Sequence, residues 1–170
     1  NTALTVNSST TTIIGGLFTL EAWIYPTAVG SSGTSMIICQ DDGLSGSQGY
    51  QFGIQTAKTI RFLWWTASAR ANNTNIATTA TAPFYSWTHV AVSWDGTTLR
   101  IFINGVVSAS TTTFAPYNSG ITTTGVGNYY ANPGIGAGFL GYVTNARIVK
   151  GSAVYTSNFT PPTAPLTAIT

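Results

Sequence analysis

Residues 87–106 read WTHVAVSWDGTTLRIFINGV and contain two strand patterns and two turn signals in one run. From Trp87 to Trp94, large apolar side chains alternate with polar or small ones, which is the period of two that a half-buried strand requires. Asp95-Gly96 ends this run, and Leu99–Ile103 forms the next. Asn104-Gly105 favours a two-residue type I′ turn, because both positions of that turn need a positive φ angle. The segment therefore predicts successive antiparallel strands.

The rest of the chain repeats this pattern and shows almost no helical periodicity. Alternation runs from Phe18 to Tyr25 and ends at Pro26. Thr, Val, Ile and aromatic residues dominate the strand-like runs, and all of them favour strands. We therefore predict an all-β chain of roughly ten strands that forms an antiparallel β-sandwich. The further runs are residues 36–39, 50–55, 59–66, 106–110 and 139–150.

Two long stretches depart from this pattern. Residues 67–83 are rich in Ala, Asn and Thr, and residues 111–133 are rich in Thr, Gly, Asn and Tyr. Both exceed the usual loop length, so each is either a functional loop or a weakly patterned strand. We predict one domain over residues 1–160, followed by a Pro-rich extended segment over residues 161–170.

The composition excludes several classes of protein. Charged residues are 6% of the chain, against about 25% in ordinary soluble domains, and the formal net charge is +2. The six Lys and Arg residues are scattered, which argues against nucleic-acid binding. Cys39 is the single cysteine, so neither an intrachain disulfide nor a thiolate zinc site is available. No run of about 20 mainly apolar residues is present, so we expect no membrane insertion.

Five landmarks, in this order, resemble the laminin-G-like, concanavalin A-like jelly roll. They are FTLEAWIYP at residues 18–26, WTHVAVSWDG at 87–96, LRIFING at 99–105, GFLGYV at 138–143 and NARI at 145–148. The resemblance spans about residues 17–150. It implies a jelly roll of two antiparallel sheets, in a family that includes both lectins and glycoside hydrolases.

The segment VKGSAVYTSNFTPPTAP, residues 149–165, is similar to the ending of laminin-G-like modules in phage tail, fibre and other virion proteins. This resemblance implies a non-enzymatic module displayed on a virus particle or on a cell-surface protein. A low content of charge is compatible with a subunit that packs among copies of itself. Fold alone does not imply function, so the candidate sites must be considered one by one.

We expect no enzymatic activity. A glycoside hydrolase needs two carboxylates that face one sugar, and this chain has only four Asp and Glu residues. Glu21 has no acidic neighbour on its strand face, and Asp95 lies in a turn, where Asp accepts backbone hydrogen bonds. His89 is the sole histidine, and no Gly-x-Ser-x-Gly motif accompanies it. We therefore expect His89 to be hydrogen-bonded within the sandwich, and Arg147 to serve in packing or a salt link.

A calcium site is the alternative to a chain without cofactors. Ca²⁺ takes six to eight oxygen ligands, and Asp41 and Asp42, with Asn128 or Asn132, offer some of them. The acidic residue that the resemblance implies after Gly-Tyr-Val is replaced by Thr144 or Asn145. We therefore predict no cofactor, with Ca²⁺ at Asp41 and Asp42 as the open alternative.

A lectin-like site needs flat aromatic faces beside planar amides. Trp64 and Trp65 are neighbours on one predicted strand, so one side chain faces the core and the other faces away from it. An intersubunit contact explains this pair as well as a sugar platform does. Trp23, Trp87 and Trp94 are predicted to lie in the core or at its edge. The predicted ligand-binding residues are Trp64, Trp65, Tyr129, Tyr130, Asn128, Asn132 and Tyr50.

Two functional hypotheses remain. The first is a virion-surface or cell-surface module, such as a phage decoration, fibre or tail component, whose partners are other virion proteins or copies of itself in a homo-oligomer. The second is a soluble or matrix carbohydrate-binding module that holds a glycan through loop aromatics. A recognition site requires an open concavity with an aromatic and converging polar groups, whereas a structural role requires the aromatics to be buried between chains. Both hypotheses place the chain on a virion surface or outside the cell.

Overall fold

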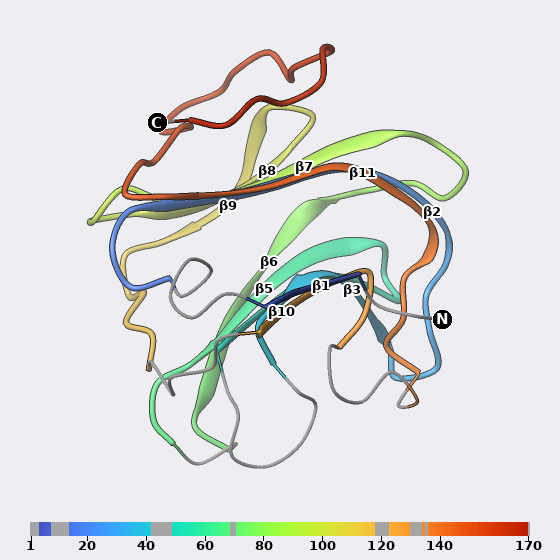
Figure 1. Cartoon of the computed structure of the whole chain (residues 1–170), viewed down its shortest axis with the longest axis horizontal. Helices are drawn as coiled ribbons and strands as arrows, with labels where there is room; N and C mark the ends of the chain where they lie inside the picture. The colour runs from blue at the N-terminus through green and yellow to red at the C-terminus, as the bar shows by residue number, and fades with distance from the viewer. Residues whose placement is uncertain are drawn as a thin grey trace.

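Two antiparallel sheets stack face to face in the computed structural model, which describes residues 4–7, 14–41, 49–68, 71–117, 123–129, 134 and 136–169 (Figure 1). The five-stranded sheet has the order β11 (Leu140–Lys150), β2 (Phe18–Ala28), β7 (Thr88–Trp94), β8 (Leu99–Ile103) and β9 (Val106–Thr111). The six-stranded sheet has the order β1 (Leu4–Asn7), β10 (Thr123–Val126), β3 (Thr34–Cys39), β4 (Tyr50–Gln55), β5 (Thr59–Trp65) and β6 (Asn73–Thr81). The prediction of an all-β antiparallel sandwich is confirmed.

The core lies between the two sheets and is largely aromatic. Phe62 of the six-stranded sheet contacts Phe18 of the other sheet, with ring centroids 5.9 Å apart. Trp64 and Phe114 extend this cluster, at a centroid distance of 5.2 Å from each other. Burying one such side chain contributes about 1.5–3 kcal/mol, so the facing rings hold the sheets together.

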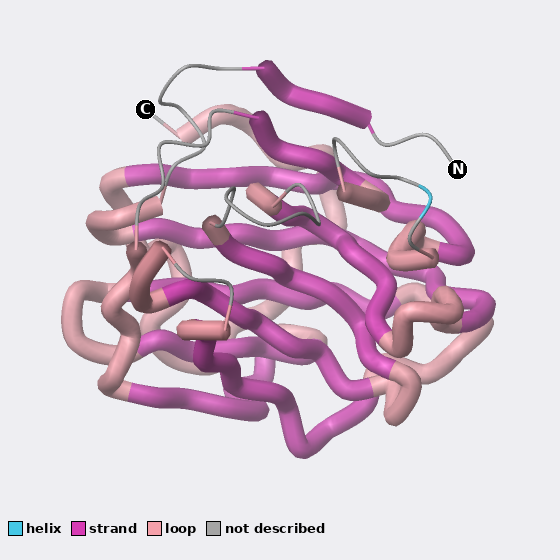
Figure 2. The backbone as a smooth tube through the Cα atoms, turned by 90° about the horizontal axis from the view of Figure 1, so that it is seen from below, coloured by secondary structure: helices cyan, strands magenta, loops and turns pink. Residues whose placement is uncertain are grey.

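The strands of each sheet lie side by side (Figure 2), and the alternation of side chains along them separates the core from the outer face of the six-stranded sheet. On β4, Tyr50, Phe52 and Ile54 are fully buried in the core cluster. Gln51 and Gly53 alternate with them and therefore face the other way. The register pairs Tyr50 with Trp64 and Phe52 with Phe62, so β5 presents the same alternation.

The two weakly patterned stretches each contain a strand. Residues 67–83 contain β6, an edge strand of Asn, Thr and Ala in which Thr78 is buried and most other residues are exposed. Residues 111–133 contain β10, which joins β1 to β3. β6 carries few apolar side chains because it buries little of its own surface, whereas β10 is only four residues long and buries Thr124 and Gly125.

The C-terminal residues 151–169 contain no strand and run over the outer face of the five-stranded sheet (Figure 1). Phe159 N–H donates to the carbonyl of Gly105, and Trp23 Nε1 donates to the carbonyl of Pro162 over 3.0 Å. Asn104 and Gly105 have φ angles of 49° and 78°, which confirms the positive-φ turn. A side chain on Gly105 would collide with the carbonyl of Phe159. The glycine therefore also lets the C-terminal segment pack against the turn. The predicted division between residues 160 and 161 stays a prediction.

Candidate functional site

A network of four polar side chains lies on the outer face of the six-stranded sheet, and we call it the Arg61 network. Gln51 stands at its centre: its Nε2 donates to Asp41 Oδ2 over 2.6 Å and to the Tyr129 hydroxyl over 2.9 Å. Arg61 Nη2 donates to Gln51 Oε1 over 2.7 Å. The amide of Gln51 therefore links a carboxylate, a phenol and a guanidinium from three other parts of the chain.

The strand register brings these groups together. Gln51 pairs with Cys39 on one side and with Leu63 on the other, which places it in the middle of the sheet. Arg61 pairs with Gly53. Because Gly53 has no side chain, nothing on β4 stands between Arg61 and Gln51. Asp41 lies two residues after Cys39, the last residue of β3.

Within this network, the Arg61 guanidinium is a fixed, partly buried cation beside the polar edge strand β6. Burial lowers the pKa of Arg61 from its usual value. Its Nε is buried without a hydrogen-bond partner among the described residues. On β6, which borders β5, Asn75 and Ala77 are exposed and pair with Leu63 and Arg61. A guanidinium held in this way can donate in a fixed direction to the hydroxyls or the carboxylate of a ligand.

The structure places the predicted ligand-binding and metal-binding residues very differently. Tyr50 and Trp64 lie in the core and present no face to solvent. Trp65 points away from the core, as the alternation predicts, but only 2% of it is exposed. Asn128 is fully buried, and its Oδ1 accepts the Tyr129 N–H over 2.9 Å. Asp42, Tyr130 and Asn132 lie outside the described residues.

Of the predicted residues, Asp41 and Tyr129 are brought together by Gln51, which follows Tyr50 in the sequence, and Arg61, which completes the network, was missed. Gln51 and Arg61 lie on adjacent strands, each flanked by buried apolar residues. That alternation is visible in the sequence and puts both side chains opposite the core. No group of three or more His, Cys, Asp or Glu side chains that could hold a metal is found among the described residues.

A second polar cluster lies on the outer face of the five-stranded sheet, beneath the C-terminal segment. We call it the Glu21 cluster. Arg147 Nε donates to Glu21 Oε1 over 2.7 Å, the Tyr155 hydroxyl donates to Oε2 over 2.9 Å, and His89 Nε2 lies 3.1 Å from Oε2. Burial acts to raise the pKa of Glu21, but the hydrogen bonds from these three side chains outweigh it and hold that pKa below its usual value. The expected hydrogen bond of His89 and salt link of Arg147 are confirmed.

The remaining described carboxylate is also engaged. Asp95 Oδ1 accepts the backbone N–H groups of Thr97 and Thr98, and Oδ2 pairs with Arg100. The Thr98 N–H and the Arg100 guanidinium lower the pKa of Asp95 to about 2. Its structural role in the turn is confirmed.

Three aromatic side chains form a row on the outer face of the five-stranded sheet, which we call the aromatic row. Tyr25 has ring centroids 5.5 Å from Trp87 and 6.0 Å from Tyr142. Trp87 is 45% exposed, so the prediction that it lies in the core or at its edge is wrong. The register explains the difference: Ile24 pairs with Thr88, which places Trp87 beside Tyr25 on the face away from the core. Trp94 packs against the core as predicted.

The comparisons with known proteins agree with this architecture. A laminin-G family model described as Concanavalin A-like lectin/glucanases superfamily matches residues 1–154. No curated protein sequence matches the chain. Among the described residues there is no helix of the length and apolar character that a membrane span needs.

Solved structures of the same fold share little sequence with this chain. The CBM40 of the Ruminococcus gnavus IT-sialidase, bound to alpha2,3 sialyllactose, has a TM-score of 0.59 at 11% identity, with 83% of this chain and 85% of that chain covered. Domain 4 of AbnA, a GH43 extracellular arabinanase from Geobacillus stearothermophilus in complex with arabinotriose, has a TM-score of 0.62 at 17% identity, with 86% and 65% covered. At such identities the likeness shows the fold alone. On the match of its own sequence, this chain belongs to the concanavalin A-like lectin/glucanase superfamily.

Proposed function

We propose that the chain is a non-catalytic carbohydrate-binding module that holds a glycan against the outer face of the six-stranded sheet at Arg61. The observation that carries this proposal is the Arg61 network, because the buried amide of Gln51 fixes the Arg61 guanidinium in place before any ligand arrives. Fixed donors and acceptors bind hydroxyls without a further loss of side-chain entropy. The glycans bound in the two solved structures of similar fold support this ligand class.

The absence of catalysis is part of the proposal. Glu21 is fully buried beneath the C-terminal segment, and Asp95 is bound within its turn. Asp41 is fully buried and hydrogen-bonded to Gln51. None of these three described carboxylates is placed to act as an acid or nucleophile on a glycosidic bond, which needs two carboxyl groups on either side of it. A surface or extracellular location fits a glycan ligand.

The test is a glycan array probed with the full chain and three variants. Arg61→Gln removes the guanidinium, and Arg61→Lys keeps the charge but removes the planar fork. Lys58→Gln is the matched control, because Lys58 is exposed in the turn between β4 and β5 and its loss removes the same charge. Thermal unfolding of each variant shows that it is folded.

We expect the wild-type chain and Lys58→Gln to bind the same glycans equally well, Arg61→Gln to bind them least, and Arg61→Lys to bind them with intermediate strength. The bound glycans should be recovered uncleaved. Equal binding by Arg61→Gln would refute the role of Arg61, and released sugar fragments would refute the non-catalytic assignment.

A second candidate is a structural module of a virion or cell surface, such as a phage decoration, fibre or tail component. Its support is the low content of charge together with the exposed Trp87, Tyr142 and Tyr85 side chains, which are of types enriched at protein interfaces. The mass of the native particle in solution, with and without Ca²⁺, tests it. A stable trimer or larger assembly that ignores Ca²⁺ supports this candidate, and a monomer near 17.8 kDa contradicts it. A Ca²⁺-dependent mass or melting temperature would instead support a calcium site at Asp41 and Asp42.

A further inference from the structure

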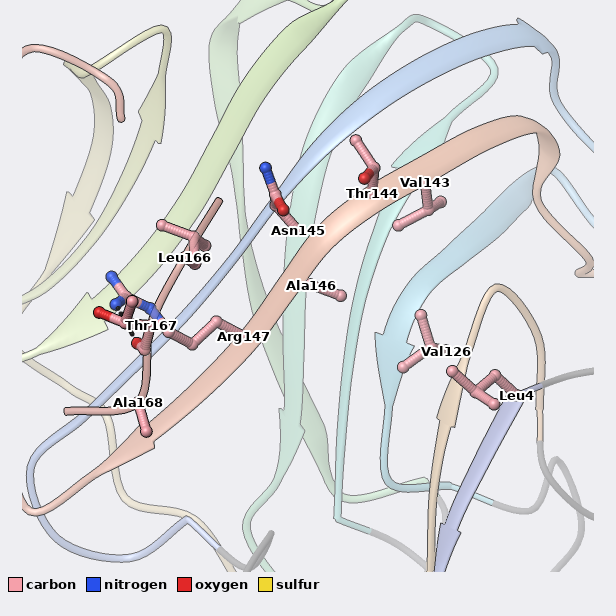
Figure 3. Close-up of a pocket in the computed structure, with 10 residues that line it drawn as sticks. All are labelled: Leu4, Val126, Val143, Thr144, Asn145, Ala146, Arg147, Leu166, Thr167 and Ala168. Carbon is pink, nitrogen blue, oxygen red and sulfur yellow. Dashed lines mark hydrogen bonds between the residues drawn. The ribbon is translucent and has the colours of Figure 1, made fainter. Parts of the chain in front are cut away.

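A pocket of about 430 Å³ lies along β11, with the C-terminal segment on one side and Leu4 of β1 and Val126 of β10 on the other (Figure 3). Thr144 lies two residues after Tyr142 on a regularly paired stretch of β11, so both side chains point to the same face of the sheet. Thr144 and Asn145 line the pocket from the strand, and Leu166 lines it from the C-terminal segment. This volume lies in the range of about 300–1,000 Å³ that small-ligand sites occupy.

Asn145 gives the pocket a polar group in a fixed direction. The pairing between β11 and β2 shifts between Thr144 and Arg147, and Asn145 has a φ angle of 51° within this bulge. A bulge on an edge strand re-aims a side chain away from the regular alternation. Figure 3 shows the amide projecting from the strand, between Thr144 and Leu166 in this view, with no hydrogen bond to the other residues drawn.

The chemistry of this surface favours an uncharged, hydroxyl-rich ligand. The rings of Tyr25, Trp87 and Tyr142 offer apolar faces, while their hydroxyl and indole N–H groups are polar. Arg147, the one charged residue that lines the pocket, already donates to Glu21 and to the carbonyl of Thr167. A sugar ring combines an apolar C–H face with hydroxyl edges and so complements this combination.

The C-terminal segment defines where this surface ends. It covers Trp23, which donates to the carbonyl of Pro162, and it contacts Arg147, which donates to the carbonyl of Thr167. The side chains of Tyr142 and Trp87, by contrast, remain 66% and 45% exposed. We propose that the aromatic row and this pocket form a second carbohydrate-binding site, at which a neutral oligosaccharide stacks on the row and places one end beside Asn145. The inference rests on the proposed function for its ligand class, but it uses the other sheet and none of the residues of the Arg61 network.

The test measures the affinity of the full chain for neutral oligosaccharides, arabinotriose and cellotetraose among them, by calorimetry. The probe variants are Trp87→Ala with Tyr142→Ala, and Asn145→Gly, in which glycine accepts the positive φ. The control variant is Tyr85→Ala, which removes a 68% exposed tyrosine outside the row. Acrylamide quenching of tryptophan fluorescence reports mainly on Trp87, the most exposed of the five tryptophans, because Trp64 and Trp65 are buried and Trp23 and Trp94 are half-buried.

We expect the wild-type chain to bind sugar at two sites, the double variant to bind it at one, Asn145→Gly to weaken the second site severalfold, and Tyr85→Ala to leave both sites unchanged. Bound sugar should shield Trp87 from acrylamide. A double variant that still binds sugar at two sites overturns the second site. A wild-type chain with a single site that Arg61→Gln abolishes also overturns it, but leaves the proposed function intact. Shielding of Trp87 without sugar, with a doubled particle mass, overturns it in favour of a contact between two copies.

Discussion

Glu21 shows how a buried carboxylate is stabilised within the five-stranded sheet. Removing a charge from water costs several kcal/mol unless partners replace the lost hydration. Glu21 receives donors from β11 and from the C-terminal segment, and His89 of β7 lies against it. The carboxylate therefore ties three parts of the molecule together, and its loss should be felt in stability.

We predict that Glu21→Gln lowers the free energy of unfolding by about 3 kcal/mol at pH 7, because it leaves the partly buried Arg147 without its counter-charge. Urea denaturation measures this change. Tyr142→Phe, on an exposed position of β11, serves as the control and should lie within about 0.5 kcal/mol of wild type.

The same residue sets a pH dependence. The folded pKa of Glu21 lies below its usual value, so its contribution to stability is complete above that usual pKa and is lost as the pH falls through the folded pKa. Asp95, whose pKa falls from 3.8 to about 2, adds to this loss at lower pH. We expect the wild-type chain to lose stability steeply below about pH 4.5, and Glu21→Gln to lose less over the same interval. Parallel curves for the two chains would contradict this origin.

Cys39 should be inert in the folded chain. Burial raises the pKa of its thiol well above the usual range, and the side chain is fully buried. Only the thiolate reacts with alkylating reagents. We predict no labelling by iodoacetamide under native conditions and complete labelling in denaturant, measured by mass spectrometry. Rapid native labelling would show that the outer face of β3 opens.

Gln51 and Arg61 show the limit of prediction at this scale. Their alternation with apolar neighbours fixes the face on which they lie, but not the hydrogen bonds between them. Those bonds depend on the register of β4 against β5, which pairs Arg61 with Gly53. No local sequence pattern specifies that register. Large aromatic residues misled the sequence interpretation, because Tyr50 and Trp64 fill the core as readily as they would stack on a sugar.

The C-terminal segment acts as an additional layer on the five-stranded sheet. Tyr155 and Phe159 stack with centroids 3.6 Å apart and cover Phe102, which is fully buried. Asn158 Oδ1 accepts the Val107 N–H over 2.9 Å, which satisfies part of edge strand β9. A segment without regular structure therefore supplies both apolar cover and hydrogen bonds.

We predict that Phe159→Ala lowers the free energy of unfolding by about 2 kcal/mol, less than the 3–5 kcal/mol of a fully buried phenylalanine because its side chain is only partly buried. Denaturant unfolding measures this, and Ile169→Ala, at a 45% exposed position, is the control. Equal stability of the two variants would mean that the segment lies loosely on the sheet.

β2 and β7 could be predicted because their core-facing residues are apolar and alternate with polar or small residues, although their other faces are largely buried as well. β6 and β10 could not, because β6 is mostly exposed and β10 is only four residues long. Their places follow from pairing with β5 and β3, which is a tertiary constraint. The bulge at Asn145 is equally invisible in the sequence, although Asn tolerates the positive φ that the bulge imposes.

At the scale of the whole molecule, the sandwich presents two different outer faces. The six-stranded sheet carries a charged, hydrogen-bonded network around Arg61. The five-stranded sheet carries the C-terminal segment over one part of its surface and the aromatic row at the other (Figure 1). Membership of a superfamily of lectins and glucanases gives the scaffold, and the function depends on what these two faces bind.

The most direct measurement of the central claim is an NMR titration of the isotope-labelled chain with a glycan that it binds on the array. The Nε–H signal of Arg61 and the side-chain amide signals of Gln51 report on the Arg61 network itself, and signals of the Glu21 cluster serve as the internal reference. We expect the Arg61 and Gln51 signals to shift in proportion to the bound fraction, while the signals of the Glu21 cluster stay fixed. Saturation with glycan that leaves both signals unmoved would contradict it.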